Sequence, residues 1–246
     1  MERIGTVRML RRHPVKSMAG ESLDEARVTF TGLVGDRVYA FVENGNRSNF
    51  SWMTGRQAPD LILFRPRFLN PPSVVEEHPN TERYGAEVTT PEGERFEVSD
   101  PRFKEFLEQR SGRSLRLRFS ERSMNDSRPV SLFGLGTIRA LAEKTGVKLD
   151  ARRFRPNFEV EWASDEPFFE DRLIGRTLGI GDTLAVQAVK KTARCVMITL
   201  DPESAAASPQ VLEKVVRNHG GCAGIYGAVL REGVVRVSDP VYLANS

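Results

Sequence analysis

Short segments rich in β-branched, aromatic and leucine residues recur along this chain, and this pattern limits its fold more than any other feature. Such segments, bounded by turn residues, are typical of β-strands. Strands are predicted at residues 4–10, 37–42, 61–64, 96–98, 115–119, 158–161, 184–189, 195–200 and 234–237. Glycine-containing turns separate several of them, at 32–35, 43–46 and 179–182. Many short strands indicate sheets that close into barrels.

Three segments have the start and stop signals of helices. Two of them open with a cap residue followed by proline, at 100–101 and at 208–209. Glycines are predicted to end all three helices, at Gly112, Gly146 and Gly220. The last helix is expected to bury Val211, Leu212, Val215 and Val216. The predicted fold class is mainly β with a few helices (α+β).

The length of the chain sets the number of domains. Its 246 residues, 39% of them hydrophobic, suit one large or two small domains with a real core. A turn near residues 90–100 leads into the first predicted helix. We therefore predict two domains, residues 1–95 and residues 96–246.

The charge balance excludes one class of partner. The 36 basic residues nearly match the 33 acidic ones, and the formal net charge is +3. This is not the composition of a polycationic nucleic-acid binder, so no nucleic-acid partner is predicted. A local basic cluster can still hold a small anionic ligand.

Two further features bear on the compartment. No run of about 18 apolar residues is present, so no membrane-spanning helix is predicted. The arginine-rich N-terminus lacks an apolar stretch and alternates like a strand, so it is interpreted as part of the fold. The two cysteines, Cys195 and Cys222, match neither a disulfide framework nor a zinc pattern. The expected compartment is the reducing cytoplasm.

Cys195 lies between a basic turn and an apolar run, in the segment 190–202. A thiol at a strand end beside cations such as Arg194 can ionise, and a thiolate is a soft metal ligand. A single cysteine is also often a small buried hydrophobic residue, and both interpretations stay open from these residues alone. Cys222 lies in a glycine-rich segment and is either an incidental residue or a second redox thiol.

Three further clusters carry cations and hydrogen-bonding groups. Lys16 and Ser17 follow a proline turn and can hold a phosphate, or they form a solvated turn. A glycine turn precedes Asp36 and Arg37, which form a structural ion pair or face the same anion. Residues 152–155 include three arginines, which repel one another unless anions compensate; the alternative is a surface charge run.

These clusters and the Cys195 segment occur in the order and at the approximate spacing of the MOSC family, which the chain closely resembles. The family is named after the C-terminal part of molybdenum cofactor sulfurase. The resemblance rests on residues 13–18, 35–37, 54–57, 154–157, 194–195, 201–202 and 239–243, and so covers nearly the whole chain. It implies a β-barrel MOSC domain at 96–246. The part before residue 96 resembles the smaller N-terminal β-barrel domain of the family's amidoxime-reducing members.

The resemblance implies a site for the molybdenum cofactor, in which molybdopterin holds the metal. The family's molybdenum-ligating cysteine falls on Cys195. A looser match at residues 125–129 would place Asp126 near the metal and Ser127 near the pterin tail, with Arg128 in place of a small hydroxyl residue. Contacts to the pterin and its phosphate are expected from Lys16, Ser17, Arg37, Arg155, Asn157 and Arg194.

The function implied by the resemblance is an oxidoreductase that removes oxygen from N-hydroxylated substrates such as amidoximes. The sequence has no cysteine set for an iron–sulfur cluster and no flavin or dinucleotide fingerprint. A small-molecule substrate and a separate electron-transfer protein, of ferredoxin or flavin type, are therefore expected. The alternative is a carrier of the molybdenum cofactor, or a sulfur-transfer protein that carries a persulfide on Cys195.

Overall fold

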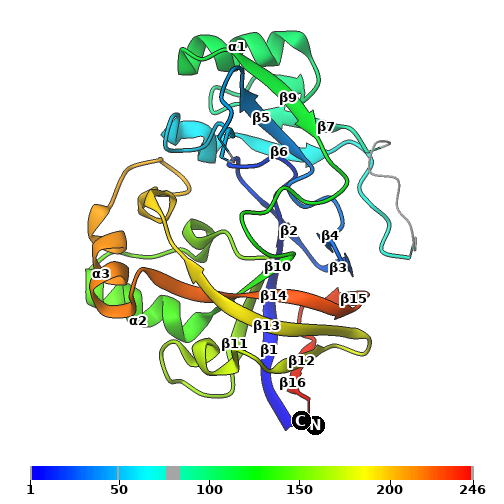
Figure 1. Ribbon diagram of the computed structural model, residues 1–246, viewed down its shortest axis with the longest axis vertical. Helices are drawn as coiled ribbons and strands as arrows, with labels where there is room; N and C mark the ends of the chain where they lie inside the picture. The colour runs from blue at the N-terminus through cyan, green and yellow to red at the C-terminus, as the bar shows by residue number, and fades with distance from the viewer. Residues whose placement is uncertain (1, 49, 76–83, 245–246) are drawn as a thin grey trace.

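The computed structural model describes residues 2–48, 50–75 and 84–244. Two lobes lie one above the other in Figure 1, and both ends of the chain lie at the base of the lower lobe. The lower lobe contains β1, β10 to β14 and β16 with helices α2 and α3. The upper lobe contains β5 to β9 and helix α1. The fold is mainly β with a few helices, as the sequence predicts.

The lower lobe is a closed barrel. Its seven strands are β1 (Glu2–Arg12), β10 (Val130–Gly134), β11 (Phe158–Trp162), β12 (Thr177–Ile180), β13 (Leu184–Ala193), β14 (Cys222–Arg231) and β16 (Pro240–Leu243). The order is β11-β10-β14-β13-β12-β16-β1, and pairing of β1 with β11 closes the ring. The short strand β2 (Glu21–Leu23) extends the sheet beyond β1. Closure leaves the barrel without free edges.

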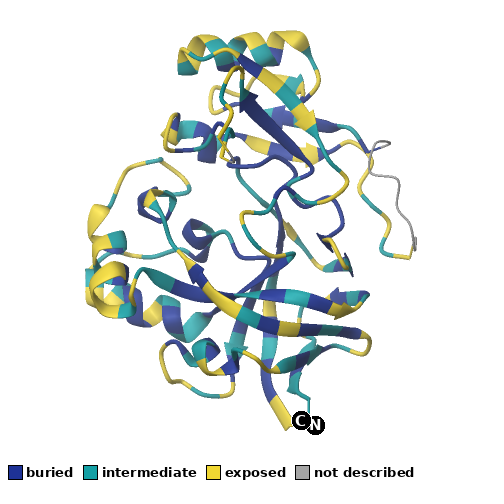
Figure 2. Ribbon diagram, in the orientation of Figure 1, coloured by how far each residue is buried: buried dark blue, intermediate teal, exposed yellow. Residues whose placement is uncertain are grey.

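The N-terminal strand β1 belongs to this barrel, although the elements of the upper lobe follow it directly in sequence. Val7 and Leu10 on β1 are fully buried and pack in a core of valine, leucine and isoleucine side chains. The burial colouring of Figure 2 shows β10 and much of β1 dark blue, whereas the outer turns of α3 are largely yellow. The segment from Ile4 to Leu10 is therefore part of the barrel core.

The upper lobe has its own sheets and core. A two-stranded sheet joins β5 (Tyr39–Glu43) to β9 (Leu115–Phe119), and a three-stranded sheet joins β6 (Arg65–Phe68), β7 (Ala86–Thr89) and β8 (Arg95–Glu97). Aromatic rings fill the space between them and helix α1 (Pro101–Ser111); the Phe41 and Phe103 rings meet edge to face at 5.5 Å. The strands β3 (Glu25–Thr29), β4 (Gly32–Leu33) and β15 (Gly233–Arg236) form a third small sheet.

The predicted division between residues 95 and 96 stays a prediction. Strand pairings join the segments on its two sides. Strand β1 pairs with β11 and β16, β3 pairs with β15, and β5 pairs with β9.

The three predicted helices are confirmed at α1, α2 (Leu135–Thr145) and α3 (Pro209–His219). Asp100 caps α1 by accepting a hydrogen bond from the Arg102 backbone N at 2.9 Å. The predicted glycines end all three helices in the left-handed conformation. The prediction for Val216 is wrong: it is 52% exposed. It lies about 100° round the helix from the buried Val215, beyond the face that packs inward.

Two predicted strands are instead short 3-10 helices. Residues 61–64 fall mostly in η1 (Pro59–Leu63), and residues 195–200 contain η5 (Val196–Thr199). Proline at the start of η1 presets a helical φ. In the second segment the Cys195 carbonyl accepts a hydrogen bond from the Ile198 backbone N at 3.2 Å, which turns the chain back. A short apolar run alone does not distinguish a strand from a helical turn.

Glu170 gives the fold a pH dependence that can be measured. Its side chain is fully buried in η4 (Phe169–Leu173), and Oε1 accepts hydrogen bonds from the Gly134 backbone N and Thr137 Oγ1 at the start of α2. Burial raises its pKa. The folded state therefore holds the proton of Glu170 more tightly than the unfolded state does. Its contribution to the free energy of unfolding is present at low pH and is lost as the pH rises through the folded-state pKa.

We expect Glu170→Gln, which cannot ionise, to gain stability relative to the wild type as the pH increases from about 4 to 8. Urea unfolding of both proteins across this range would measure the difference in free energy of unfolding. Parallel stability curves would show that Glu170 does not titrate with folding.

Candidate functional site

A cavity of about 150 Å³ lies where the two lobes meet, and most of the predicted site residues line it. Its walls come from the β1–β5 connection, residues 50–57, residues 125–128, the segment before β11, the end of β13 and strand β14. The predicted residues that line it are Lys16, Ser17, Arg37, Asp126, Arg155, Arg194 and Cys195. Segments far apart in sequence thus meet in one place.

Cys195 lies where β13 leaves the barrel. The ladder with β14 ends where Ala193 pairs with Cys222, and the Arg194 backbone N still donates to the Gly221 carbonyl at 2.8 Å. Cys195 itself is extended, and η5 turns away directly after it. Its thiol is half-buried and forms no disulfide. The strand end therefore presents a free thiol to the cavity.

Three non-glycine residues of this cavity have left-handed backbones. The φ angles are 68° at Ser17, 51° at Arg37 and 52° at Arg155. Each such conformation costs on the order of 1–2 kcal/mol for an L-residue. Hydrogen bonds hold two of the turns together, since Arg37 donates to the Arg155 carbonyl at 3.0 Å and Arg155 donates to the Met18 carbonyl at 2.6 Å. Strained backbone of this kind clusters at functional sites.

Lys16 points at the loop that carries Asp126. Its Nζ donates to the Met124 carbonyl at 2.7 Å and to Asp126 Oδ1 at 2.6 Å, and lies 5.5 Å from the centre of the Trp52 ring. Burial lowers the pKa of Lys16, while Asp126 opposes that shift. Burial acts to raise the pKa of Asp126, but the Lys16 ammonium outweighs it, and the net shift is downward. The pair therefore stays ionised beside the cavity.

Asp36 and His13 form a buried polar cluster with Arg37. The sequence left open an ion pair between Asp36 and Arg37, and the structure shows one. Asp36 is fully buried and also accepts a hydrogen bond from the His13 backbone N at 2.8 Å. Burial acts to raise the Asp36 pKa, but Arg37 and His13 hold it well below its usual range. Burial lowers the pKa of His13, and the nearby Arg155 and Arg37 lower it further.

Arg155 and Arg194 are partly buried cations. Burial and the neighbouring Arg37 lower the pKa of Arg155 to about 9, and one of its terminal nitrogens is buried with no hydrogen-bond partner. Burial lowers the pKa of Arg194 to about 10. Arg194 donates to the Ala223 carbonyl at 2.7 Å and the Phe154 carbonyl at 2.8 Å, which fixes it in place. A bound anion would stabilise both charges.

Two predicted residues do not line the cavity. Asn157 is 1% exposed, and its side chain joins β10 to β1: Oδ1 accepts from the Ser131 backbone N at 3.1 Å, and Nδ2 donates to the Arg11 carbonyl at 3.3 Å. Ser127 is half-buried on the neighbouring loop, outside the lining. Their predicted roles in binding stay predictions.

The lining also contains aromatic and apolar residues that no sequence motif indicated. Trp52, Met197 and Tyr226 all face the cavity. Burial raises the pKa of Tyr226, so its hydroxyl is a hydrogen-bond donor at neutral pH. The sequence offered one signal for Tyr226. It is the polar residue in the short segment between Gly224 and Gly227, and glycines without side chains leave room around it.

Gly224 positions this side of the site. It lies in β14 with φ +73°, and an added Cβ would come 2.6 Å from the Phe133 ring and 2.9 Å from the Leu132 carbonyl. We expect Gly224→Ala to lower the free energy of unfolding by about 2–4 kcal/mol, from left-handed strain plus overpacking. Gly220→Ala is the matched control, because φ is also positive there and nothing lies within 4 Å. Equal losses in the two variants would contradict the packing argument.

Within the described ranges, no three His, Cys, Asp or Glu side chains are grouped so as to hold a metal ion. Among the described residues, no helix is long and apolar enough to cross a membrane.

The fold and site define a class: a two-lobed β protein with a free thiol and several partly buried cations in the cavity between a closed barrel and a second lobe. The chain belongs to the MOSC domain family. The MOSC domain model matches residues 120–242, and the MOSC N-terminal beta barrel domain model matches residues 4–116.

Named relatives agree with this assignment. The chain is 22% identical to the mitochondrial amidoxime reducing component 2 of Bos taurus, over 98% of this chain and 84% of that protein. It is 23% identical to the mitochondrial amidoxime-reducing component 1 of Mus musculus, over 99% and 83%. The structure of the YUAD protein from Bacillus subtilis superposes with a TM-score of 0.52 and 14% identity, over 97% of this chain and 94% of that one. This last match shows a shared fold.

Proposed function

We propose that this protein binds the molybdenum cofactor through Cys195 and reduces N-oxygenated small molecules with electrons from a separate redox protein. The single observation that carries the proposal is the free Cys195 thiol in a cavity lined by Lys16, Arg37 and Arg155. Two of the named relatives are amidoxime-reducing components, which supports the choice of substrate class.

The residues present fit this cofactor. Molybdopterin carries a phosphate and two soft sulfur ligands, so it needs cations at one end and leaves a thiolate to complete a sulfur-rich metal environment. The unpartnered Arg155 nitrogen is a buried donor without an acceptor, as a phosphate site requires. Lys16 and Arg37 would add further charge-assisted contacts. Cys195 would be the protein's ligand to the metal.

When bound, the cofactor supplies the two-electron chemistry that accepts an oxygen atom from the substrate. The overall reduction breaks one N–O bond, consumes two electrons and two protons, and releases the oxygen as water. The protein's part is to orient the substrate and supply protons. The Tyr226 hydroxyl and the Lys16–Asp126 pair are titratable groups that line the same cavity. Trp52 and Met197 offer apolar surface for the substrate.

The test is molybdenum analysis and a reductase assay on protein from a host that makes the cofactor. We expect about one molybdenum per chain and reduction of benzamidoxime to benzamidine with a chemical reductant. Retained molybdenum with no turnover on any N-oxygenated compound would favour the cofactor-carrier alternative. Absence of molybdenum, with a persulfide on Cys195 by mass spectrometry, would favour sulfur transfer.

A further inference from the structure

A second cavity, of about 380 Å³, lies on the other side of Arg155. Arg155 contributes to the walls of both cavities, and it is the one residue in both linings among those the structure describes. The second cavity lies between β1–β2 of the lower lobe and β6–β8 of the upper lobe, and the segment after η5 closes one side. Its volume falls in the range of about 300–1,000 Å³ that is usual for small-molecule sites.

Arginines dominate the lining of this cavity. They are Arg11, Arg65, Arg67, Arg95, Arg152 and Arg155. The acidic residues of the lining are Glu21 and Glu203. Guanidinium groups that converge in this way repel one another and bind phosphate or carboxylate groups through paired donors.

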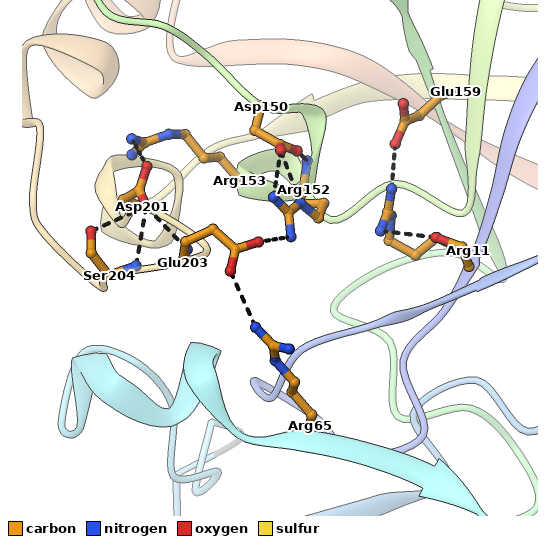
Figure 3. A network of polar contacts seen from close by, with 10 residues as sticks. Arg11, Arg65, Asp150, Arg152, Arg153, Glu159, Asp201, Glu203 and Ser204 are labelled. Atoms are coloured by element: carbon orange, nitrogen blue, oxygen red, sulfur yellow. Dashed lines mark hydrogen bonds and ion pairs between the residues drawn. The ribbon is translucent and has the colours of Figure 1, made fainter. Parts of the chain in front are cut away.

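Carboxylates neutralise part of this charge, but not all of it. In Figure 3, Glu203 bridges Arg65 of the upper lobe and Arg152 of the lower lobe, and Arg11 pairs with Glu159. Arg67 pairs with Glu87. Arg95 and Arg155 form no ion pair within the described part of the chain, so two cations of this lining have no carboxylate within salt-bridge distance.

One residue of this lining also carries a buried donor without an acceptor. Arg11 is 7% exposed, and its Nε has no hydrogen-bond partner among the described residues. Leaving a buried donor unsatisfied costs about 1–3 kcal/mol, more when the group is charged, unless a ligand supplies the acceptor.

We propose that this second cavity binds a compact polyanion, one that carries at least two phosphate or carboxylate groups. Among the described residues the site shares Arg155 alone with the Cys195 cavity, and it does not depend on the proposed molybdenum chemistry. We infer two anionic groups because the two arginines without an ion pair come from different lobes, Arg95 from β8 and Arg155 from the segment before β11. The bound anion would also offset the burial that lowers the pKa of Arg155.

The test is calorimetric titration of the purified protein with pyrophosphate, and in parallel with citrate, at constant ionic strength. Arg95→Gln is the informative variant, because Arg95 is exposed and unpaired and its loss should leave the melting temperature unchanged. Arg116→Gln is the matched control: Arg116 is equally exposed, on β9, and lines neither cavity. Lys16→Gln reports on binding in the Cys195 cavity.

We expect saturable binding of pyrophosphate or citrate to the wild type, about tenfold weaker or more in Arg95→Gln and unchanged in Arg116→Gln and Lys16→Gln. Three results would overturn the proposal. They are no saturable binding of either anion, equal weakening in Arg95→Gln and Arg116→Gln, and weakening in Lys16→Gln alone, which would place the anion in the Cys195 cavity. Comparison of the two dissociation constants shows the ligand type. Tighter binding of pyrophosphate would indicate a phosphate ligand, and tighter binding of citrate would indicate a carboxylate ligand.

Discussion

Replacing Cys195 with alanine is expected to reduce bound molybdenum to background and to abolish amidoxime reduction, while the fold is retained. The thiol is half-buried at the end of β13 and forms no disulfide, so its removal leaves no broken structural bond. Soft thiolate ligands hold metals that oxygen ligands hold poorly. Cys195→Ser should therefore fail as completely as Cys195→Ala, although serine nearly matches cysteine in size. Elemental analysis and the benzamidoxime assay measure both effects.

Cys222 provides the internal control for this prediction. It is the other free cysteine. In the β13–β14 ladder Cys222 pairs with Ala193, and Ala193 is two residues before Cys195 in the chain. Cys222→Ala should keep its molybdenum. If Cys222→Ala loses the metal and Cys195→Ala keeps it, the ligand has been assigned to the wrong cysteine. If both variants keep it, neither thiol binds the metal.

Replacing Arg155 with alanine should weaken cofactor retention about 10- to 100-fold. This follows from the loss of charge-assisted hydrogen bonds to a buried phosphate, each contributing about 1.5–3 kcal/mol. Arg155 lines the cavity, has a buried nitrogen without a hydrogen-bond partner, and forms no ion pair among the described residues. The fraction of molybdenum that remains after dialysis, compared with the wild type, is the measurement.

A loss of stability could imitate that result, because Arg155 also donates to the Met18 carbonyl. Arg155→Gly separates the two causes. Glycine relieves the left-handed backbone at this position, where φ is 52°, so it should be more stable than alanine by about 1 kcal/mol. The two variants should nevertheless retain the cofactor equally poorly. If Arg155→Gly retains more cofactor than Arg155→Ala, in proportion to its higher melting temperature, then Arg155 affects cofactor retention through the stability of the fold alone.

Local signals in the sequence predicted the helices well. The cap at Asp100 and the left-handed glycines at Gly112, Gly146 and Gly220 act within one turn of the chain, so a few residues determine where each helix starts and stops. Strand prediction was weaker where the run was short. Residues 61–64 and 195–200 have strand-like composition but form 3-10 turns, because the packing around them decides the outcome.

The candidate site divides in the same way. Short motifs identified Lys16, Arg37, Arg155 and Cys195, and the structure brings them to one cavity. The sequence could not show that Asn157 joins strands behind that cavity, because its partners Ser131 and Arg11 are far from it in the chain. Nor could it show the left-handed turns, because a non-glycine residue carries no mark of a positive φ.

The sequence by itself determined the class of fold, the helix ends, the free thiol and the cations that surround it, since each depends on residue type and on neighbours a few positions away. The tertiary structure alone decided that β1 closes the barrel and that six separate arginines surround a second cavity. Both depend on pairing between segments more than a hundred residues apart, such as Leu10 with Phe158. Long-range pairing is set by how all the strands pack at once, which no single segment encodes.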